Sequence, residues 1–327
     1  MEKRKQMLSS IIPSCESAEH LSGNFEEKVQ RTNDEASDLK ASAVALGYWK
    51  DPFISCFVTP SSDRQRTAEM HRGCFVRVKG IEVVVHQFLS VYGREGQVVN
   101  LGAGYDTLYW KLRRNSVALG CFVEVDFDEV VHRKKALLEK HSAVFNDDDG
   151  NVVESVPIAA TESKSEIHTG DYYVQFAGTY FCCTNIDIVG MRSHVSHPTR
   201  MRKFAGLLGT GNDNFMNIFE SNMERRGIPV PGLKNFKDDA SLRSLLATAG
   251  WQKVIHWRAD DVFECCIPSE SRQRIEKIEF LDEPFLLSQL LHHYVFVIAS
   301  RGRCTQTEIN FECRKSTSPP FSNFFDS

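Results

Sequence analysis

Apolar positions along the chain alternate between helical spacing and the short continuous runs of strands. Residues 33–49 predict a helix, because Asn33 or Asp34 can cap it and acidic residues fill its first turn. Residues 72–92 repeat apolar side chains every three or four positions, which also predicts a helix. The same reasoning predicts further helices at 128–140, 213–226, 239–249 and 271–292. Apolar runs typical of strands occur at 119–127, 251–259 and 294–302.

The stretch QVVNLGAGYDTLYWKLR, at 97–113, combines three signals in a few residues. Val98, Val99 and Leu101 form a short apolar run, two glycines follow, and a helical apolar stripe begins at Tyr109. The stretch therefore predicts a strand, a glycine turn and a helix. Since strands and helices alternate along the chain, we expect an α/β layered fold with a mainly parallel sheet.

The polar ends of the chain set the expected domain boundaries. Residues 1–25 are polar and lack periodicity, which predicts a mobile tail, and turn-forming residues at 304–327 predict a disordered one. Residues 26–303 are then expected to form a single domain. Within it, the acidic stretch 144–170 is expected to be a loop.

Composition excludes several classes of protein. The chain of 327 residues has a formal net charge of −4, which argues against a nucleic-acid-binding protein. No apolar run approaches the roughly 18–20 residues that span a bilayer, and the N-terminus lacks the apolar core of a signal peptide. Ten cysteines occur without a C-x-x-C pair, so we expect no metal site and reduced thiols in a cytoplasmic protein.

The glycine turn offers bare backbone to a ligand. Gly102 and Gly104 let a ligand approach main-chain N–H groups without a side chain in the way. A nicotinamide dinucleotide site would need a third glycine where Thr107 stands, which weakens that reading. S-adenosylmethionine carries no phosphate, and a turn of this kind can bind it.

An acidic strand end follows the turn at the distance that a ribose-binding carboxylate needs. Glu124 and Asp126 lie two residues apart in the strand at 119–127, so they share one face of it. One of them is expected to bind ribose hydroxyls, although both could instead be solvated at the strand end. Together with the glycine turn, this pattern favours methyl transfer over a nicotinamide-dependent dehydrogenase.

Longer segments on either side of this pattern can be compared with known families. They are TNDEASDLKASAVALGYWKDPFISCFV, HRGCFVRVKGIEVVVHQFL, VVNLGAGYDTLYWKL, FVEVDF, DNFMNIFESNMERRG, LLATAGW and RIEKIEFLDEPFLLSQLLHHYVFVIASRG. Together they resemble the leucine carboxyl methyltransferases, which methylate the C-terminal carboxylate of the protein phosphatase 2A catalytic subunit. The resemblance implies a class I S-adenosylmethionine-dependent methyltransferase, with a Rossmann-like sheet flanked by helices and extra N-terminal helices.

The same resemblance implies a set of cofactor-binding residues. Two basic residues face the cofactor in the family, and a planar guanidinium such as that of Arg72 can bind both oxygens of a carboxylate. The matching positions here are Lys40, Arg72, Gly102, Gly104 and Asp126, with Glu124 as the second choice for the ribose.

The implied reaction needs no general base. The terminal carboxylate of the substrate attacks the methyl group of S-adenosylmethionine, and with a pKa of about 3.5 it is already ionised at neutral pH. Catalysis then depends mainly on positioning, and no catalytic residue is assigned. The expected partner is the C-terminal tail of the phosphatase catalytic subunit. We expect a cytoplasmic monomer that binds neither nucleic acid nor membrane.

Residues 178–211 depart from the family pattern. Gly178 or Thr179 stands where the family has an Asp-Leu pair against the adenine, and no glutamate occurs between Glu166 and Glu220 to line the methyl-transfer site. Asp187 is a weak substitute. We therefore expect an incomplete or altered central sheet. The alternative function is a catalytically impaired splice or gene-model variant that acts at most as a phosphatase- or cofactor-binding protein.

Overall fold

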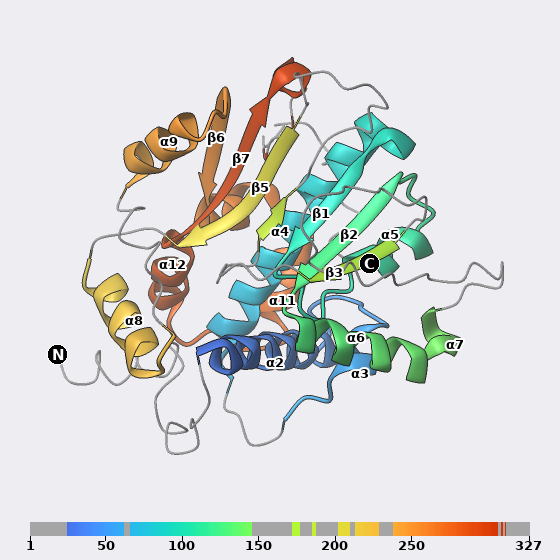
Figure 1. Ribbon diagram of the computed structural model, residues 1–327. Helices are drawn as coiled ribbons and strands as arrows, with labels where there is room; N and C mark the ends of the chain where they lie inside the picture. The colour runs from blue at the N-terminus through green and yellow to red at the C-terminus, as the bar shows by residue number, and fades with distance from the viewer. Residues whose placement is uncertain are drawn as a thin grey trace.

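One seven-stranded sheet runs through the molecule in the order β3-β2-β1-β4-β5-β7-β6 (Figure 1). The computed structural model describes residues 25–61, 66–145, 172–176, 185–187, 202–209, 213–228 and 238–306, together with Ile309 and Phe311. The strands are β1 (Gln97–Leu101), β2 (Cys121–Asp126), β3 (Tyr172–Phe176), β4 (Asn185–Asp187), β5 (Arg202–Gly209), β6 (Lys253–Arg258) and β7 (Tyr294–Arg301).

The strand directions confirm the predicted fold class. β1, β2 and β3 are parallel, and β7 runs antiparallel to β5 and to β6 on its two sides. The order is that of a Rossmann-like sheet with an added strand, β7, next to the edge. Two strands, β4 and β7, run opposite to the other five. Of residues 178–211 the structure describes β4 and β5, and both belong to the sheet. β4 has only three residues and runs antiparallel to both β1 and β5. The expected alteration of the central sheet therefore takes the form of a short, reversed strand.

Helices cover the sheet and extend beyond its edge (Figure 1). α4 contacts α2, α12 and β5, whereas α9 lies against β6. α2 and α6 lie side by side, joined by an ion pair of 3.2 Å between Asp34 and Arg133. The longer helices are α2 (Phe25–Ala45), α4 (Ala68–Tyr92), α5 (Leu108–Arg114), α6 (Asp128–Lys140), α8 (Asn214–Arg225), α9 (Asp239–Thr248), α11 (Ser269–Glu276) and α12 (Pro284–His292). The shorter helical segments are α3 (Ile54–Phe57), α7 (Ser142–Phe145), α10 (Ala259–Asp261), η2 (Gly93–Glu95), η4 (Val262–Cys266) and η5 (Gly302–Gln306).

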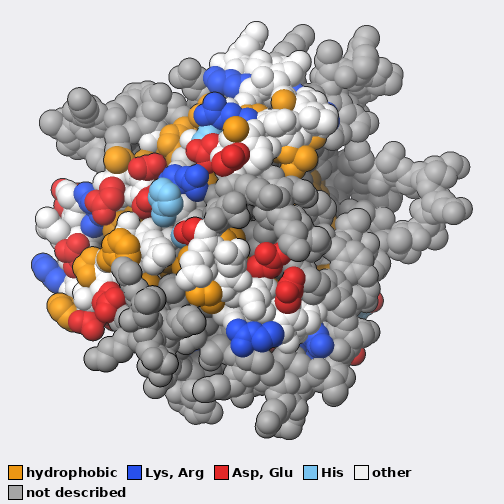
Figure 2. Space-filling model, turned by 90° about the vertical axis from the view of Figure 1, so that its left-hand side faces the viewer, with side chains coloured by type: hydrophobic (Ala, Val, Ile, Leu, Met, Phe, Trp, Pro, Cys, Tyr) orange, Lys and Arg blue, Asp and Glu red, His pale blue; other side chains and the backbone are white. Residues whose placement is uncertain are grey.

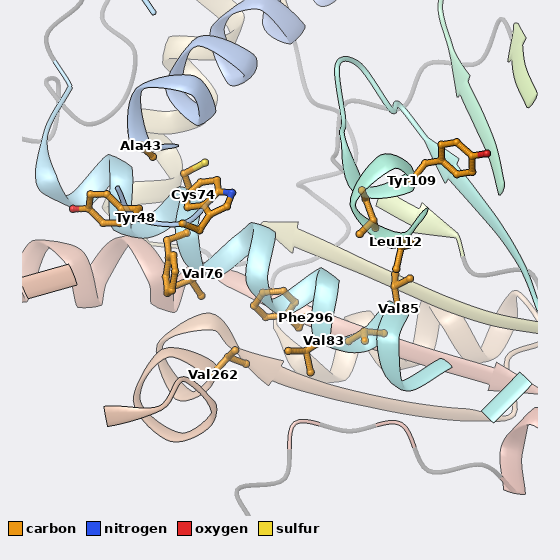
Figure 3. Close-up of a cluster of buried hydrophobic side chains, with 14 of the residues drawn as sticks. Ala43, Tyr48, Cys74, Val76, Val83, Val85, Tyr109, Leu112, Val262 and Phe296 are labelled. Atoms are coloured by element: carbon orange, nitrogen blue, oxygen red, sulfur yellow. The ribbon is translucent and has the colours of Figure 1, made fainter. Parts of the chain in front are cut away.

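The main core includes a close contact between α4 and β7. Phe296 of β7 lies so close to α4 that a Cβ atom on Gly80 would come within 2.4 Å of its ring. Figure 3 shows Phe296 beside Val83, with Val76 further along the same helix. Full burial of a side chain of this size stabilises the fold by about 1.5–3 kcal/mol. The close approach of helix and strand therefore requires a glycine at position 80.

The helix predicted over 271–292 is wrong as one continuous element. It is two helices, α11 and α12, separated by residues 277–283. Pro284 occupies the first turn of α12, where its missing N–H costs nothing because that group would have no partner within the helix. In the middle of a longer helix it would break the hydrogen-bond ladder, so the chain ends one helix and begins another.

The predicted disordered tail begins too early. Cys304 is fully buried, and Ile309 and Phe311 are 1% and 4% exposed. The ring of Phe311 lies 5.1 Å from that of Trp257 and 5.1 Å from that of Phe296. Cys304, Ile309 and Phe311, which the sequence assigned to that tail, are therefore buried in the folded protein. Residues 1–24 and 312–327, which include most of both predicted tails, lie outside the described residues.

Surface charge follows the mixed composition of the sequence. On the face shown in Figure 2, basic and acidic side chains are interspersed with apolar ones. Among the described helices, none has both the length and the apolar composition needed to cross a bilayer.

Candidate functional site

The glycine turn lies at the carboxyl ends of β1 and β2, the edge at which open α/β sheets bind ligands. Gly102 has φ +63°, and its N–H donates to the carbonyl of Val125 at 2.7 Å. Gly104 has φ +49°, and its N–H donates to Asp126 Oδ2 at 2.6 Å. The turn and the acidic strand end therefore meet, as the sequence pattern predicts.

Asp126 retains capacity for a ligand. Oδ1 accepts from the N–H of Phe127 at 2.7 Å and Oδ2 from Gly104, whereas a carboxylate can accept about four hydrogen bonds. Burial raises the pKa of Asp126 above its ordinary value, because it outweighs the two N–H donors and the charge of Lys134. Hydroxyl groups that donate to this carboxylate would offset that loss of hydration, so the residue suits the two hydroxyls of a ribose.

Glu124 lies inside the protein. It is 1% exposed, and Oε2 lies 2.5 Å from Lys134 Nζ. The same ammonium group donates to the carbonyl of Asp106 at 2.9 Å. Glu124 therefore supports the end of the glycine loop from beneath. The reading in which both acids are solvated at the strand end is wrong for Glu124.

The N-terminal helix α2 covers the glycine turn. Asn33 Oδ1 accepts from the N–H of Tyr105 at 2.9 Å, and a Cβ on Gly104 would lie 2.3 Å from that oxygen. Glycine at 104 is therefore required both by its backbone angle and by the approach of the helix.

Lys40, also on α2, reaches the start of α5. Its ammonium group donates to Thr107 Oγ1 at 2.7 Å and lies 3.2 Å from Asp51 Oδ2 and 3.6 Å from Asp106 Oδ1. Burial alone would lower the pKa of Lys40, but the nearby carboxylates outweigh it and raise the pKa above its usual range. Lys40 is therefore a firmly charged group beside the glycine turn.

Arg72 is a buried cation on α4. The residue is 3% exposed, and Nη2 donates to the carbonyl of Glu279 at 2.9 Å. Its Nε is buried without a hydrogen-bond partner, and no carboxylate of the described residues lies within ion-pair distance of its guanidinium. A buried charge without a counter-ion is costly, so the site favours an anionic ligand group.

The carboxylate of Glu279 is bound by other residues. Oε2 accepts from Tyr48 Oη at 2.8 Å and lies 2.7 Å from His71 Nδ1. The other ring nitrogen of His71 lies 3.0 Å from Ser42 Oγ, on the same helix as Lys40. His71 thus links Ser42 of α2 to Glu279, and α2 connects the glycine turn to the neighbourhood of Arg72.

Asp51 is the residue of this region that the sequence did not reveal. It lies 56 positions from Thr107 and 11 from Lys40, and no spacing rule relates them. A local signal did exist, because an aspartate shortly before an apolar run can cap a helix. Asp51 Oδ1 does accept from the N–H groups of Phe53 and Ile54, both at 3.1 Å, at the start of α3.

Comparison with known proteins gives the family. The family model for leucine carboxyl methyltransferase matches residues 29–165, a range that holds the glycine turn, Asp126, Lys40 and Arg72. The probable leucine carboxyl methyltransferase 1 of Caenorhabditis briggsae is 30% identical, over 83% of this chain and 90% of that protein. The chain belongs to the leucine carboxyl methyltransferase family.

Two further relatives show the range of the family. The bovine leucine carboxyl methyltransferase 1 is 28% identical, over 85% of this chain and 91% of that protein. The human tRNA wybutosine-synthesizing protein 4 is 26% identical, over 83% of this chain and 44% of that protein. Because the present chain belongs to the leucine carboxyl methyltransferase family, it is an enzyme that needs a methyl donor. Since the alignments extend over most of the chain, the impaired-variant alternative is not favoured.

Proposed function

We propose that the protein is an S-adenosylmethionine-dependent methyltransferase that esterifies the C-terminal leucine carboxylate of the protein phosphatase 2A catalytic subunit. The observation that carries the cofactor assignment is the meeting of Asp126 with the backbone of Gly104 at the ligand edge of the sheet. The names of the relatives support the choice of a leucine carboxylate as substrate. The proposal includes a monomeric enzyme in the cytoplasm.

The residues present fit this cofactor. Asp126 would accept from the ribose hydroxyls, and the backbone at Gly102 and Gly104 would lie against the nucleoside. Arg72, with its unpartnered Nε, and Lys40 would face the carboxylate of the methionine part. When bound, S-adenosylmethionine supplies an electrophilic methyl group on its sulfonium sulfur. Glu124 is assigned no contact with the cofactor, because it is buried against Lys134.

The contribution of the protein to the reaction is mainly geometric. A peptide carboxylate is ionised at neutral pH, so no side chain has to remove a proton from it. The protein has to align the attacking oxygen with the methyl carbon at about 3–3.5 Å and exclude competing water. No general base is assigned for this reason.

Calorimetric titration of the purified chain tests the cofactor. We expect S-adenosylmethionine to bind and NAD to give no heat. The Arg72→Ala variant should keep the fold and lose at least about tenfold in affinity, as expected for a charged hydrogen-bonding group. Arg94→Ala is the matched control, because Arg94 is exposed in η2, just after the end of α4. Equal affinity in the Arg72→Ala variant and the wild type would contradict the assigned role.

Methyl transfer tests the substrate. Radiolabelled S-adenosylmethionine should label the phosphatase catalytic subunit, and a subunit that lacks its terminal leucine should remain unlabelled. Labelling of the shortened subunit would overturn the proposed substrate.

A further inference from the structure

Asp51 is a buried carboxylate at the centre of a hydrogen-bonded chain that ends at the candidate cofactor site. The residue is 5% exposed, and its two oxygens have different partners. Oδ1 accepts from two backbone N–H groups of the 53–54 segment. Oδ2 accepts from Thr107 Oγ1 at 2.5 Å and lies 3.2 Å from Lys40 Nζ. The carboxylate is thus fixed by the backbone and presents one oxygen to Thr107 and Lys40.

Thr107 connects the two charged groups. Its hydroxyl donates to Asp51 Oδ2 and accepts from Lys40 Nζ at 2.7 Å. Because a hydroxyl has only one hydrogen, its donation to Asp51 turns a lone pair toward Lys40. The position of the carboxylate therefore sets the direction in which the ammonium group is bound.

Lys40 keeps hydrogen-bonding capacity in this arrangement. An ammonium group has three N–H donors. Within the described part of the chain Lys40 donates to Thr107 at 2.7 Å and to Asp51 Oδ2 at 3.2 Å, which leaves one N–H for a ligand. A lysine side chain has four rotatable bonds and loses considerable rotamer freedom when it is fixed. If another group of the protein fixes the lysine side chain before a ligand arrives, less rotamer entropy is lost when that ligand binds.

We infer that Asp51 is a positioning residue, which acts through Thr107 to hold the ammonium group of Lys40 toward the carboxylate of the methyl donor. The inference rests on the proposed function, since that function supplies the carboxylate. It adds a residue that lies outside the glycine turn and its acidic partner. Asp51 itself touches no ligand.

The test compares two ligands that differ in the amino-acid part. S-adenosylhomocysteine carries the carboxylate, whereas 5′-methylthioadenosine lacks it and keeps the nucleoside. Asp51→Asn preserves an oxygen that can accept from the backbone of α3 but removes the charge. We expect Asp51→Asn and Lys40→Met each to weaken S-adenosylhomocysteine about tenfold and to leave 5′-methylthioadenosine within about twofold.

A double-mutant cycle shows whether Asp51 acts through Lys40. In the Lys40→Met background, Asp51→Asn should weaken S-adenosylhomocysteine by no more than about twofold further. The inference is overturned if the affinity losses of the two single variants multiply in the double variant. It is also overturned if the Asp51→Asn variant binds S-adenosylhomocysteine like the wild type. Equal weakening of both ligands would reduce Asp51 to a structural role and overturn it as well. A wild-type protein that binds neither ligand would instead refute the proposed function, and with it this inference.

Discussion

The N–H of Gly104 donates to Asp126 Oδ2 at 2.6 Å, so the glycine turn and the end of the second strand form one unit. Asp126→Asn should weaken S-adenosylmethionine about 10- to 100-fold, because hydrogen bonds to a charged group contribute about 1.5–3 kcal/mol. Titration calorimetry measures the change. Asp128→Asn is the control, since Asp128 lies two residues further on with its side chain 62% exposed. Comparable losses in both variants would argue against a ribose contact at Asp126.

Gly104→Ala should destabilise the protein more than Gly47→Ala. Both glycines have positive φ, but a Cβ at 104 meets Asn33 Oδ1 at 2.3 Å, whereas nothing lies within 4 Å of a Cβ at 47. The backbone angle alone costs about 1–2 kcal/mol, so the clash should appear as an additional loss at position 104. Urea unfolding of the two variants measures the difference. Asn33→Ala should restore part of the stability of Gly104→Ala, and no recovery would show that the clash is not the cause.

Lys134→Met should cost about 3–5 kcal/mol, because it leaves Glu124 as a buried charge without its counter-ion. Replacing both residues, as Lys134→Met with Glu124→Leu, should recover much of that loss. Thermal and urea unfolding provide the measurement. Glu124→Gln should leave the affinity for S-adenosylmethionine within about threefold, since the residue is one pleat away from the ligand edge. A loss as large as that of Asp126→Asn would return Glu124 to the ribose site.

Lys79 predicts an unusual dependence of stability on pH. Its side chain is 1% exposed, and its ammonium group lies 3.2 Å from Glu82, whose other oxygen lies 2.5 Å from Lys111. Burial, the dominant cause, together with the charge of Lys111, lowers the pKa of Lys79 to about 8. Between about pH 8 and the ordinary lysine value the unfolded chain binds more protons than the folded one. The free energy of unfolding attributable to Lys79 should therefore rise with pH through this window.

Lys79→Met isolates that contribution. Glu82 keeps Lys111 as its partner. In the wild type, burial raises the pKa of the Glu82 carboxyl, but the charges of Lys111 and Lys79 outweigh burial and lower the pKa to about 2. We expect the variant to be about 1–3 kcal/mol more stable than the wild type near pH 7, with the advantage shrinking toward pH 10. Urea unfolding at a series of pH values provides the curve. A constant difference between the two proteins would contradict a lowered pKa at Lys79.

Helices and strands were predicted correctly from the sequence where an apolar pattern ended at a clear boundary. The strand at 97–101 and the helix at 128–140 match the structure because a glycine turn and an acidic first turn mark their ends. The helix over 271–292 failed because its apolar spacing continues past Pro284, and periodicity by itself does not show a break. The burial of Ile309 and Phe311 was missed because two apolar residues in a polar stretch form no period.

The site was predictable only as far as its residues follow one another along the chain. The turn at Gly102 and the acid at Asp126 belong to one strand-turn-helix-strand unit with known spacing. Alternation placed Glu124 on the same face as Asp126, but depth within the sheet, which separates a buried acid from a ligand-facing one, has no sequence signal. Asp51 depends on the packing of three helices, and such long-range contacts follow from tertiary structure alone.

The place of β7 in the sheet has a consequence for biosynthesis. This strand lies between β5 and β6, although it is translated after both, and its Phe296 packs closely against Gly80 of α4. While the ribosome is still making the last part of the chain, β5 and β6 have an open gap between them and exposed hydrogen-bonding edges. Nascent chains of this protein are therefore expected to require chaperone protection until residues 294–301 have emerged and closed the gap.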